Sequence, residues 1–101
     1  MARLKFYSNN YKYVFEVINI ILPPLGSVLS YHFSRANRDN ITLLEFLKES
    51  LGEEYVKLLC TVVEHELEKY GVDINFYTYL KDRKKCKELK DIIVKLKESQ
   101  I

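Results

Sequence analysis

Six cationic side chains crowd into ten residues near the carboxyl end of the chain, and they form its clearest chemical signal. They are Lys81, Arg83, Lys84, Lys85, Lys87 and Lys90. Such a surface suits phosphate binding, because each neutralised phosphate releases counterions condensed on a nucleic acid. Arg35 and Arg38 add two cations earlier in the chain. These eight residues are the candidate contacts for a nucleic acid or for an acidic protein surface.

The charge of the chain is unevenly distributed. Residues 1–39 carry a net charge of +3, residues 40–75 a net charge of −5, and residues 76–101 a net charge of +4. Two other interpretations of the basic run therefore stay open. It is either a solvated helix face, neutralised by pairs four residues apart such as Lys84 and Glu88, or it faces the acidic middle of the chain, within one molecule or across a dimer.

Other reactive residue types do not predict catalysis. Cys60 and His65 have glutamates nearby, but a structural zinc site needs four ligands, and no second pair of Cys or His stands at a suitable spacing. The chain has three glycines, too few and too scattered for a loop that cradles phosphate. We therefore expect no enzyme, no catalytic residue, no metal site and no cofactor.

The two cysteines, Cys60 and Cys86, fall on the apolar sides of expected helices, which favours buried reduced thiols. A bridge between them stays open for a thermophilic source, because intracellular disulfides occur in hyperthermophiles. The abundance of Lys, Glu, Ile and Tyr is weakly typical of such a source, although six Asn residues argue against it. The small chain is also typical in style of an accessory protein from a virus or mobile element.

No targeting or membrane segment is expected. The most apolar run, residues 14–22, is too short to cross a membrane and stops at Pro23-Pro24. The amino end lacks the apolar stretch and small residues of a signal peptide. We therefore expect a soluble cytoplasmic protein, in the host cytoplasm if it is viral, with no membrane partner and no evident small-molecule substrate.

The elements that must position these residues begin with three expected strands. Asn9-Asn10 suits the turn of a β-hairpin whose second strand starts at Tyr11. A helix over residues 11–22 is the alternative, because its apolar residues also suit a 3.6-residue period, but the many β-branched residues favour a strand. Residues 27–35 alternate between apolar and polar side chains, which predicts a third strand.

Two helices are expected next, followed by a strand and a last helix. Thr42 and Glu45 have the spacing of a capping box at the start of the first helix, and Gly52 suits its end. The second helix runs to about Tyr70, where Gly71 ends it. Residues 72–79 alternate and predict a strand. The final helix covers roughly residues 80–99, so the basic run occupies its first half.

The order β-β-β-α-α-β-α predicts a single compact α+β domain over residues 1–101. It would have two layers, in which an antiparallel sheet, formed by the N-terminal hairpin or meander and one later strand, packs against about three helices. The last helix also carries a wide apolar stripe, which is either ordinary core or the face for a partner helix. The candidate residues of that partner face are Leu89, Ile92, Ile93 and Leu96.

From these observations we expect a small non-enzymatic protein-interaction domain with an accessory or regulatory role. Its partner would be another protein or a second copy of itself, and a homodimer is the favoured assembly. The alternative is a nucleic-acid-binding regulator that uses the basic start of the last helix.

Overall fold

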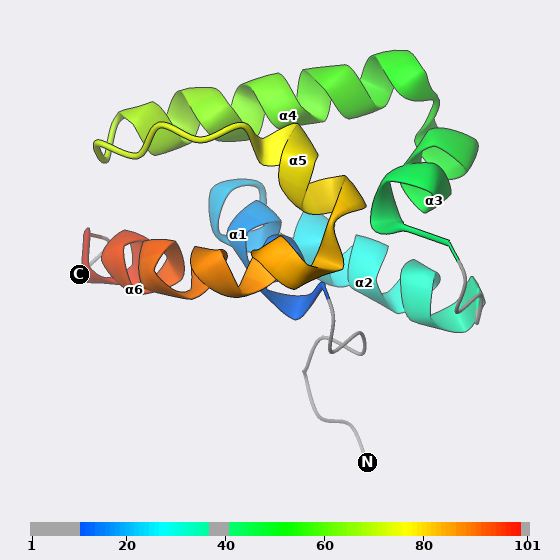
Figure 1. Ribbon diagram of the computed structural model, residues 1–101, viewed down its shortest axis with the longest axis horizontal. Helices are drawn as coiled ribbons and strands as arrows, with labels where there is room; N and C mark the ends of the chain where they lie inside the picture. The colour runs from blue at the N-terminus through cyan, green and yellow to red at the C-terminus, as the bar shows by residue number, and fades with distance from the viewer. Residues whose placement is uncertain (1–10, 37–40, 100–101) are drawn as a thin grey trace.

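The structure is a computed structural model that describes residues 11–36 and 41–99. Within these two ranges every regular element is a helix. In chain order they are α1 (Lys12–Ile21), α2 (Leu25–Ala36), α3 (Leu43–Leu51), α4 (Glu53–Glu68), α5 (Phe76–Lys81), the 3₁₀ helix η1 (Arg83–Glu88) and α6 (Leu89–Ser99). Figure 1 shows α4 along one side of the molecule and α6 along the other, with α1 and α5 between them.

The predicted α+β fold is wrong, because a sheet needs strands and the described ranges contain none. Three expected strands fall on described residues, and each lies in a helix or in an irregular link that leads into one. The remaining part of the prediction, the hairpin turn at Asn9-Asn10 and the strand before it, lies outside the described residues.

Helix α1 is the centre of the fold, since it packs against α2, α4, η1 and α6. Val14, Phe15, Val17 and Ile18 are completely buried on its inner side. Their spacing of one, three and four residues is that of a helix face. The many β-branched residues, which favoured a strand, fill the core equally well from one side of a helix.

Helix α2 takes the place of the predicted third strand. Its inward residues are Gly26, Leu29 and Ser30, which are buried, and Phe33, which is half-buried. These positions follow the helical period, whereas Tyr31, on the apolar side of the expected strand, is 44% exposed. The alternation in the sequence is therefore a coincidence of composition.

Gly26 allows the backbones of α1 and α2 to approach closely. A Cβ atom at this position would collide with the carbonyl oxygen of Phe15 and the backbone of Asn19. The side-chain oxygen of Asn19 also accepts a hydrogen bond from the backbone N–H of Ser27, at 3.1 Å, and so caps the first turn of α2. Gly26 has no positive φ; Gly52 and Gly71 are the positive-φ glycines of the described ranges.

The two middle helices confirm the capping signals of the sequence. The Thr42 hydroxyl accepts a hydrogen bond from the backbone N–H of Glu45, at 3.2 Å, and the Glu45 carboxylate accepts one from the N–H of Thr42, at 3.0 Å. Helix α4 ends at Glu68, and the turn that follows it stops at Gly71, where φ is 79°. The N–H of Val72 donates to the carbonyl of Leu67, which is the longer bond of a Schellman motif.

Helix α5 takes the place of the last predicted strand. It begins at Phe76, whose backbone N–H donates to a carboxylate oxygen of Glu64 on α4, at 2.7 Å. A carboxylate at the start of a helix satisfies a free N–H group and complements the helix dipole. Phe76, Tyr79 and Leu80 are buried at helical spacing. The short alternation of residues 72–79 therefore does not distinguish a strand from a link followed by a short helix.

Candidate nucleic-acid interface

The basic run is divided among three elements rather than carried by one long helix. Lys81 ends α5, the next four cations lie on η1, and Lys90 lies in the first turn of α6. Asp82 separates α5 from η1, because its backbone is extended and its carboxylate accepts a hydrogen bond from the N–H of Lys84, at 3.0 Å. We call the surface formed by these cations the basic edge; it comprises Lys81, Arg83, Lys84, Lys85, Lys87 and Lys90.

The 3₁₀ geometry of η1 sorts the side chains of the run into rows. With three residues per turn, side chains three positions apart eclipse one another. Arg83, Cys86 and Leu89 lie in one row, in which Arg83 is exposed and the other two are buried. The next row contains Lys84 and Lys87, and Lys90 continues it in the first turn of α6; all three lysines are exposed. We call these three lysines the basic row.

The third row has mixed charge and is tied to a tyrosine. It contains Lys85, Glu88 and Asp91, of which Lys85 is half-buried and the two acids are exposed. The Tyr79 hydroxyl donates a hydrogen bond to Glu88, at 3.0 Å. Burial together with this bond to Glu88 raises the pKa of Tyr79. The third row therefore places carboxylates directly beside the basic row.

Three cations of the basic edge lie over tyrosine rings. The pairs, with distances to the ring centroids, are Lys81 over Tyr77 at 5.8 Å, Arg83 over Tyr11 at 5.9 Å and Lys85 over Tyr79 at 6.0 Å. Such contacts attract the cation toward the face of the ring without cancelling its charge. The tyrosines thus support long side chains at the edge while leaving their charge available to an anion.

None of the six cations forms an ion pair with another residue inside the ranges 11–36 and 41–99. The ion pairs of these ranges join Glu53 with Lys57, Glu66 with Lys69, and Glu16 with Lys97. The expected pair of Lys84 and Glu88 is not formed, because a 3₁₀ helix aligns residues three apart rather than four. Ion pairs within α5, η1 and α6 therefore do not neutralise the charge of the basic edge.

The acidic middle of the chain lies away from the basic edge. Helix α4 carries most of the acidic residues of the segment 40–75, and it packs against α3, α5 and α1. The elements packed against η1 are α1, α5 and α6. Since α4 and α6 lie on opposite sides in Figure 1, a contact between acidic and basic surfaces would have to join two molecules.

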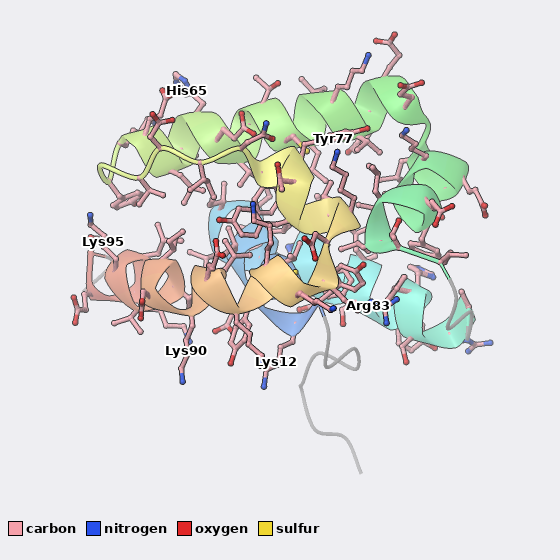
Figure 2. The ribbon with its side chains drawn as sticks, viewed as in Figure 1. Lys12, His65, Tyr77, Arg83, Lys90 and Lys95 are labelled. Atoms are coloured by element: carbon pink, nitrogen blue, oxygen red, sulfur yellow. The ribbon has the colours of Figure 1, made fainter. Side chains whose placement is uncertain are left out.

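Lys12 of α1 is a further cation beside the basic edge, and the sequence analysis missed it. It is exposed, with its Nζ 5.1 Å from the centroid of the Tyr13 ring. Helix α1 packs against both η1 and α6, and Figure 2 shows Lys12 and Lys90 extending from the same side of the molecule. No sequence signal links Lys12 with Lys90, because the two lie 78 positions apart and residue 12 was expected in a strand.

Arg35 is not brought to the basic edge. It lies near the end of α2, where its Nη1 donates a hydrogen bond to the Tyr31 hydroxyl, at 3.0 Å, and its guanidinium lies 5.7 Å from the centre of that ring. In Figure 1 this end of α2 is at the far right, well away from η1. Arg38 lies outside the described residues.

The candidate partner-helix face is occupied within the chain. Leu89, Ile93 and Leu96 are buried, and Ile92 is half-buried against the same core. Helix α1 is the main neighbour of α6. The apolar stripe of the last helix therefore packs inside this structure, which is the ordinary-core interpretation of that stripe.

Both cysteines are buried free thiols. Burial, with a smaller effect of Glu64, raises the pKa of Cys60 to about 12, and burial with Asp82 raises that of Cys86 to about 12. Such thiols are poor nucleophiles, because the thiolate is the reactive form.

The structure also shows where the other candidate reactive residues lie. Within the described ranges no group of three or more His, Cys, Asp or Glu residues is arranged to hold a metal ion. Glu64, which the sequence placed near Cys60 and His65, caps α5 instead. A search of the same residues found no helix with the length and apolar character needed to cross a membrane.

The chain was compared with protein-family models, with curated proteins and with solved structures. The comparison with family models found no match, and the comparisons with curated proteins and with solved structures found none either.

Proposed function

We propose that this protein is a small non-enzymatic module that binds the phosphate backbone of a nucleic acid on its basic edge. One observation carries the proposal: six cations stand on one continuous segment, and none has an ion-pair partner among the residues described. Grouped cations repel one another and gain most from an anion that carries many charges. A nucleic-acid backbone supplies that charge and releases counterions when it binds.

The composition of the basic edge favours contact with the backbone rather than with the bases. Its side chains are those of Lys and Arg, and contacts from these residues to phosphate fix position without reading sequence. The buried side chains of Cys86 and Leu89 anchor the segment to the core. We therefore expect binding that depends little on base sequence, with a dissociation constant in the range of about 10⁻⁴ to 10⁻⁶ M that is typical of non-specific binding.

A charge-removal variant tests this proposal. An edge variant replaces Lys81, Lys84 and Lys87 with Gln, and a matched control replaces Lys48, Lys57 and Lys69 with Gln, so that both lose the same charge. Fluorescence anisotropy with a labelled oligonucleotide at about 50 mM salt measures the affinity. We expect the edge variant to bind about tenfold more weakly or worse, and the control to bind within about twofold of the wild type.

A competition experiment separates a nucleic acid from an acidic protein surface. Poly-glutamate of matched charge is added to the complex of wild-type protein and oligonucleotide. We expect it to displace the oligonucleotide poorly, because carboxylates spaced along a peptide do not reproduce the spacing of phosphates. Displacement as efficient as that by unlabelled oligonucleotide would make an acidic protein the better partner and overturn the proposal.

A second candidate function, protein interaction by self-association, is favoured by the outer face of α4. Tyr55 and Leu58 are 47% and 58% exposed there, and the half-buried Val62 follows one turn later. Residues spaced by three and seven positions lie on one side of a helix, in this case the side away from the core. Large exposed apolar side chains that share a face are typical of interaction surfaces. We propose a second copy of the chain as the partner.

Light scattering on a gel-filtration column tests the second candidate. We expect a species of twice the 12.0 kDa chain mass at micromolar concentration, and we expect Leu58→Lys to return it to the monomer mass. Ser34→Lys, an exposed substitution on α2 away from this face, is the control that should leave the dimer intact. A wild-type species at the monomer mass over the whole concentration range would exclude self-association.

A further inference from the structure

We propose that the basic row of Lys84, Lys87 and Lys90 binds successive phosphates of one strand, so that the protein prefers single-stranded to duplex nucleic acid. This inference rests on the proposed function and adds to it the class of nucleic acid and the residues that select it. Three observations carry it: Lys84 and Lys87 are aligned on η1, the two sides of the row differ in charge, and a fourth cation continues its side.

The alignment of Lys84 and Lys87 follows from the 3₁₀ geometry of η1. A 3₁₀ helix rises about 2 Å per residue, so residues 84 and 87 stand about 6 Å apart along its axis. Successive phosphates along an extended strand have a comparable spacing. Lys90 follows three residues later, in the first turn of α6, and extends the row beyond η1.

The two sides of the basic row differ in charge. On one side the exposed carboxylates of Glu88 and Asp91 lie in the neighbouring row. A duplex is much wider than one row, so on this side its second strand would lie over these carboxylates. Like charges brought together in this way cost binding free energy. A single strand contacts the lysines alone, and it is flexible enough to follow them.

The other side of the row is extended by Lys12 of α1. Figure 2 shows Lys12 and Lys90 extending from the same side, whereas Lys95 extends from the opposite side of α6. Helix α1 packs directly against η1 and α6, so the position of Lys12 is set by the core. A strand lying along the basic row therefore has a further cation beside it.

Two variants of equal charge test the inference. The row variant replaces Lys84, Lys87 and Lys90 with Gln, and the off-row variant replaces Lys57, Lys69 and Lys95, three exposed lysines outside the basic edge, with Gln. Binding of wild type and variants to an oligothymidylate and to a mixed-sequence duplex of equal length is measured by fluorescence anisotropy between about 50 and 200 mM salt. Thermal unfolding followed by circular dichroism establishes that each variant is folded.

We expect the wild type to bind the oligothymidylate more tightly than the duplex. With three phosphates contacted, the logarithm of its affinity should fall with the logarithm of salt concentration at a slope of about −2. The row variant should lose about tenfold in affinity, and its slope should approach zero, while the off-row variant keeps the slope. A merely structural role of the lysines would not change the slope in this selective way.

The outcomes distinguish this inference from the proposed function. Tighter binding of the duplex would overturn the single-strand inference while leaving binding at the basic edge in place. Equal losses in the row and off-row variants would overturn both, because the off-row lysines lie outside the basic edge. If the wild type binds neither nucleic acid at about 50 mM salt, the proposed function fails and the inference fails with it.

Discussion

At the scale of single residues, several residues whose types could do chemistry contribute to the packing and capping of the fold. Cys86 donates a weak hydrogen bond from its thiol to the carbonyl of Tyr79, at 3.3 Å, inside the core. The Glu64 carboxylate accepts a hydrogen bond from the backbone N–H at the start of α5. Gly26 is glycine because two helix backbones meet there. In the sequence, Cys86 was a candidate for a disulfide bridge, and Glu64 was a glutamate near the candidate metal ligands Cys60 and His65.

The thiols should react only when the protein opens. Since the pKa values of Cys60 and Cys86 are raised to about 12, the thiolate is scarce at pH 8, and we expect labelling by a thiol reagent to follow the unfolding rate. The rate of colour release from Ellman's reagent, with and without denaturant, measures this. Fast labelling of the folded protein would contradict the burial of the Cys60 and Cys86 thiols.

The same pKa values predict a loss of stability in alkali. A thiol ionises near pH 9 in the unfolded chain but near pH 12 in the folded one, so its contribution to stability is complete below pH 9 and is lost between pH 9 and 12. Melting temperature measured across this range should fall. In a variant with both cysteines changed to Ala the fall should be shallower, whereas an identical slope would exclude the thiols as its cause.

Replacing Gly26 with Ala should destabilise the protein by about 1–3 kcal/mol, because the added methyl group forces α1 and α2 apart. Urea unfolding followed by circular dichroism measures the loss. Ser34→Ala, on the exposed side of the same helix, is the control and should change stability by less than about 0.5 kcal/mol. A tolerated Gly26→Ala would show that the two helices can separate freely.

At the scale of elements, the end signals of helices were predictable and the choice between helix and strand was not. The capping box of Thr42 and Glu45 and the stop at Gly71 depend on neighbouring residues, so the sequence contains them completely. Residues 12–21 were misassigned because β-branched side chains pack well in either element, and only the tertiary contacts of α1 decide. The cap of α5 comes from Glu64, twelve residues earlier, which no local pattern reveals.

Removing the carboxylate of Glu64 should loosen α5 and lower the free energy of unfolding by about 1–2 kcal/mol, the usual cost of losing a helix cap. The comparison is Glu64→Ala against Glu68→Ala, an exposed glutamate on the same helix. Chemical denaturation measures both. Equal effects in the two variants would show that the bond to Phe76 contributes nothing beyond charge.

At the scale of the whole molecule, the uneven charge of the sequence becomes a separation in space. The acidic helix α4 lies on one side, and the basic edge lies on η1 and the ends of its neighbours. The sequence predicted which cations form this edge but not how they are arranged. It predicted one long helix over residues 80–99, and no local pattern indicates that residues 83–88 form a 3₁₀ helix instead. Lys12 joins them only through the packing of α1.

The central claim is that the basic edge binds nucleic-acid phosphates, and the salt dependence of oligonucleotide binding tests it most directly. The affinity of the wild-type protein for a short oligothymidylate is measured at about 50 and 200 mM salt. We predict measurable binding at the lower concentration and a loss of about tenfold or more at the higher one, because each phosphate contact releases counterions. Absence of binding at the lower concentration, or an affinity that salt leaves unchanged, would contradict the claim.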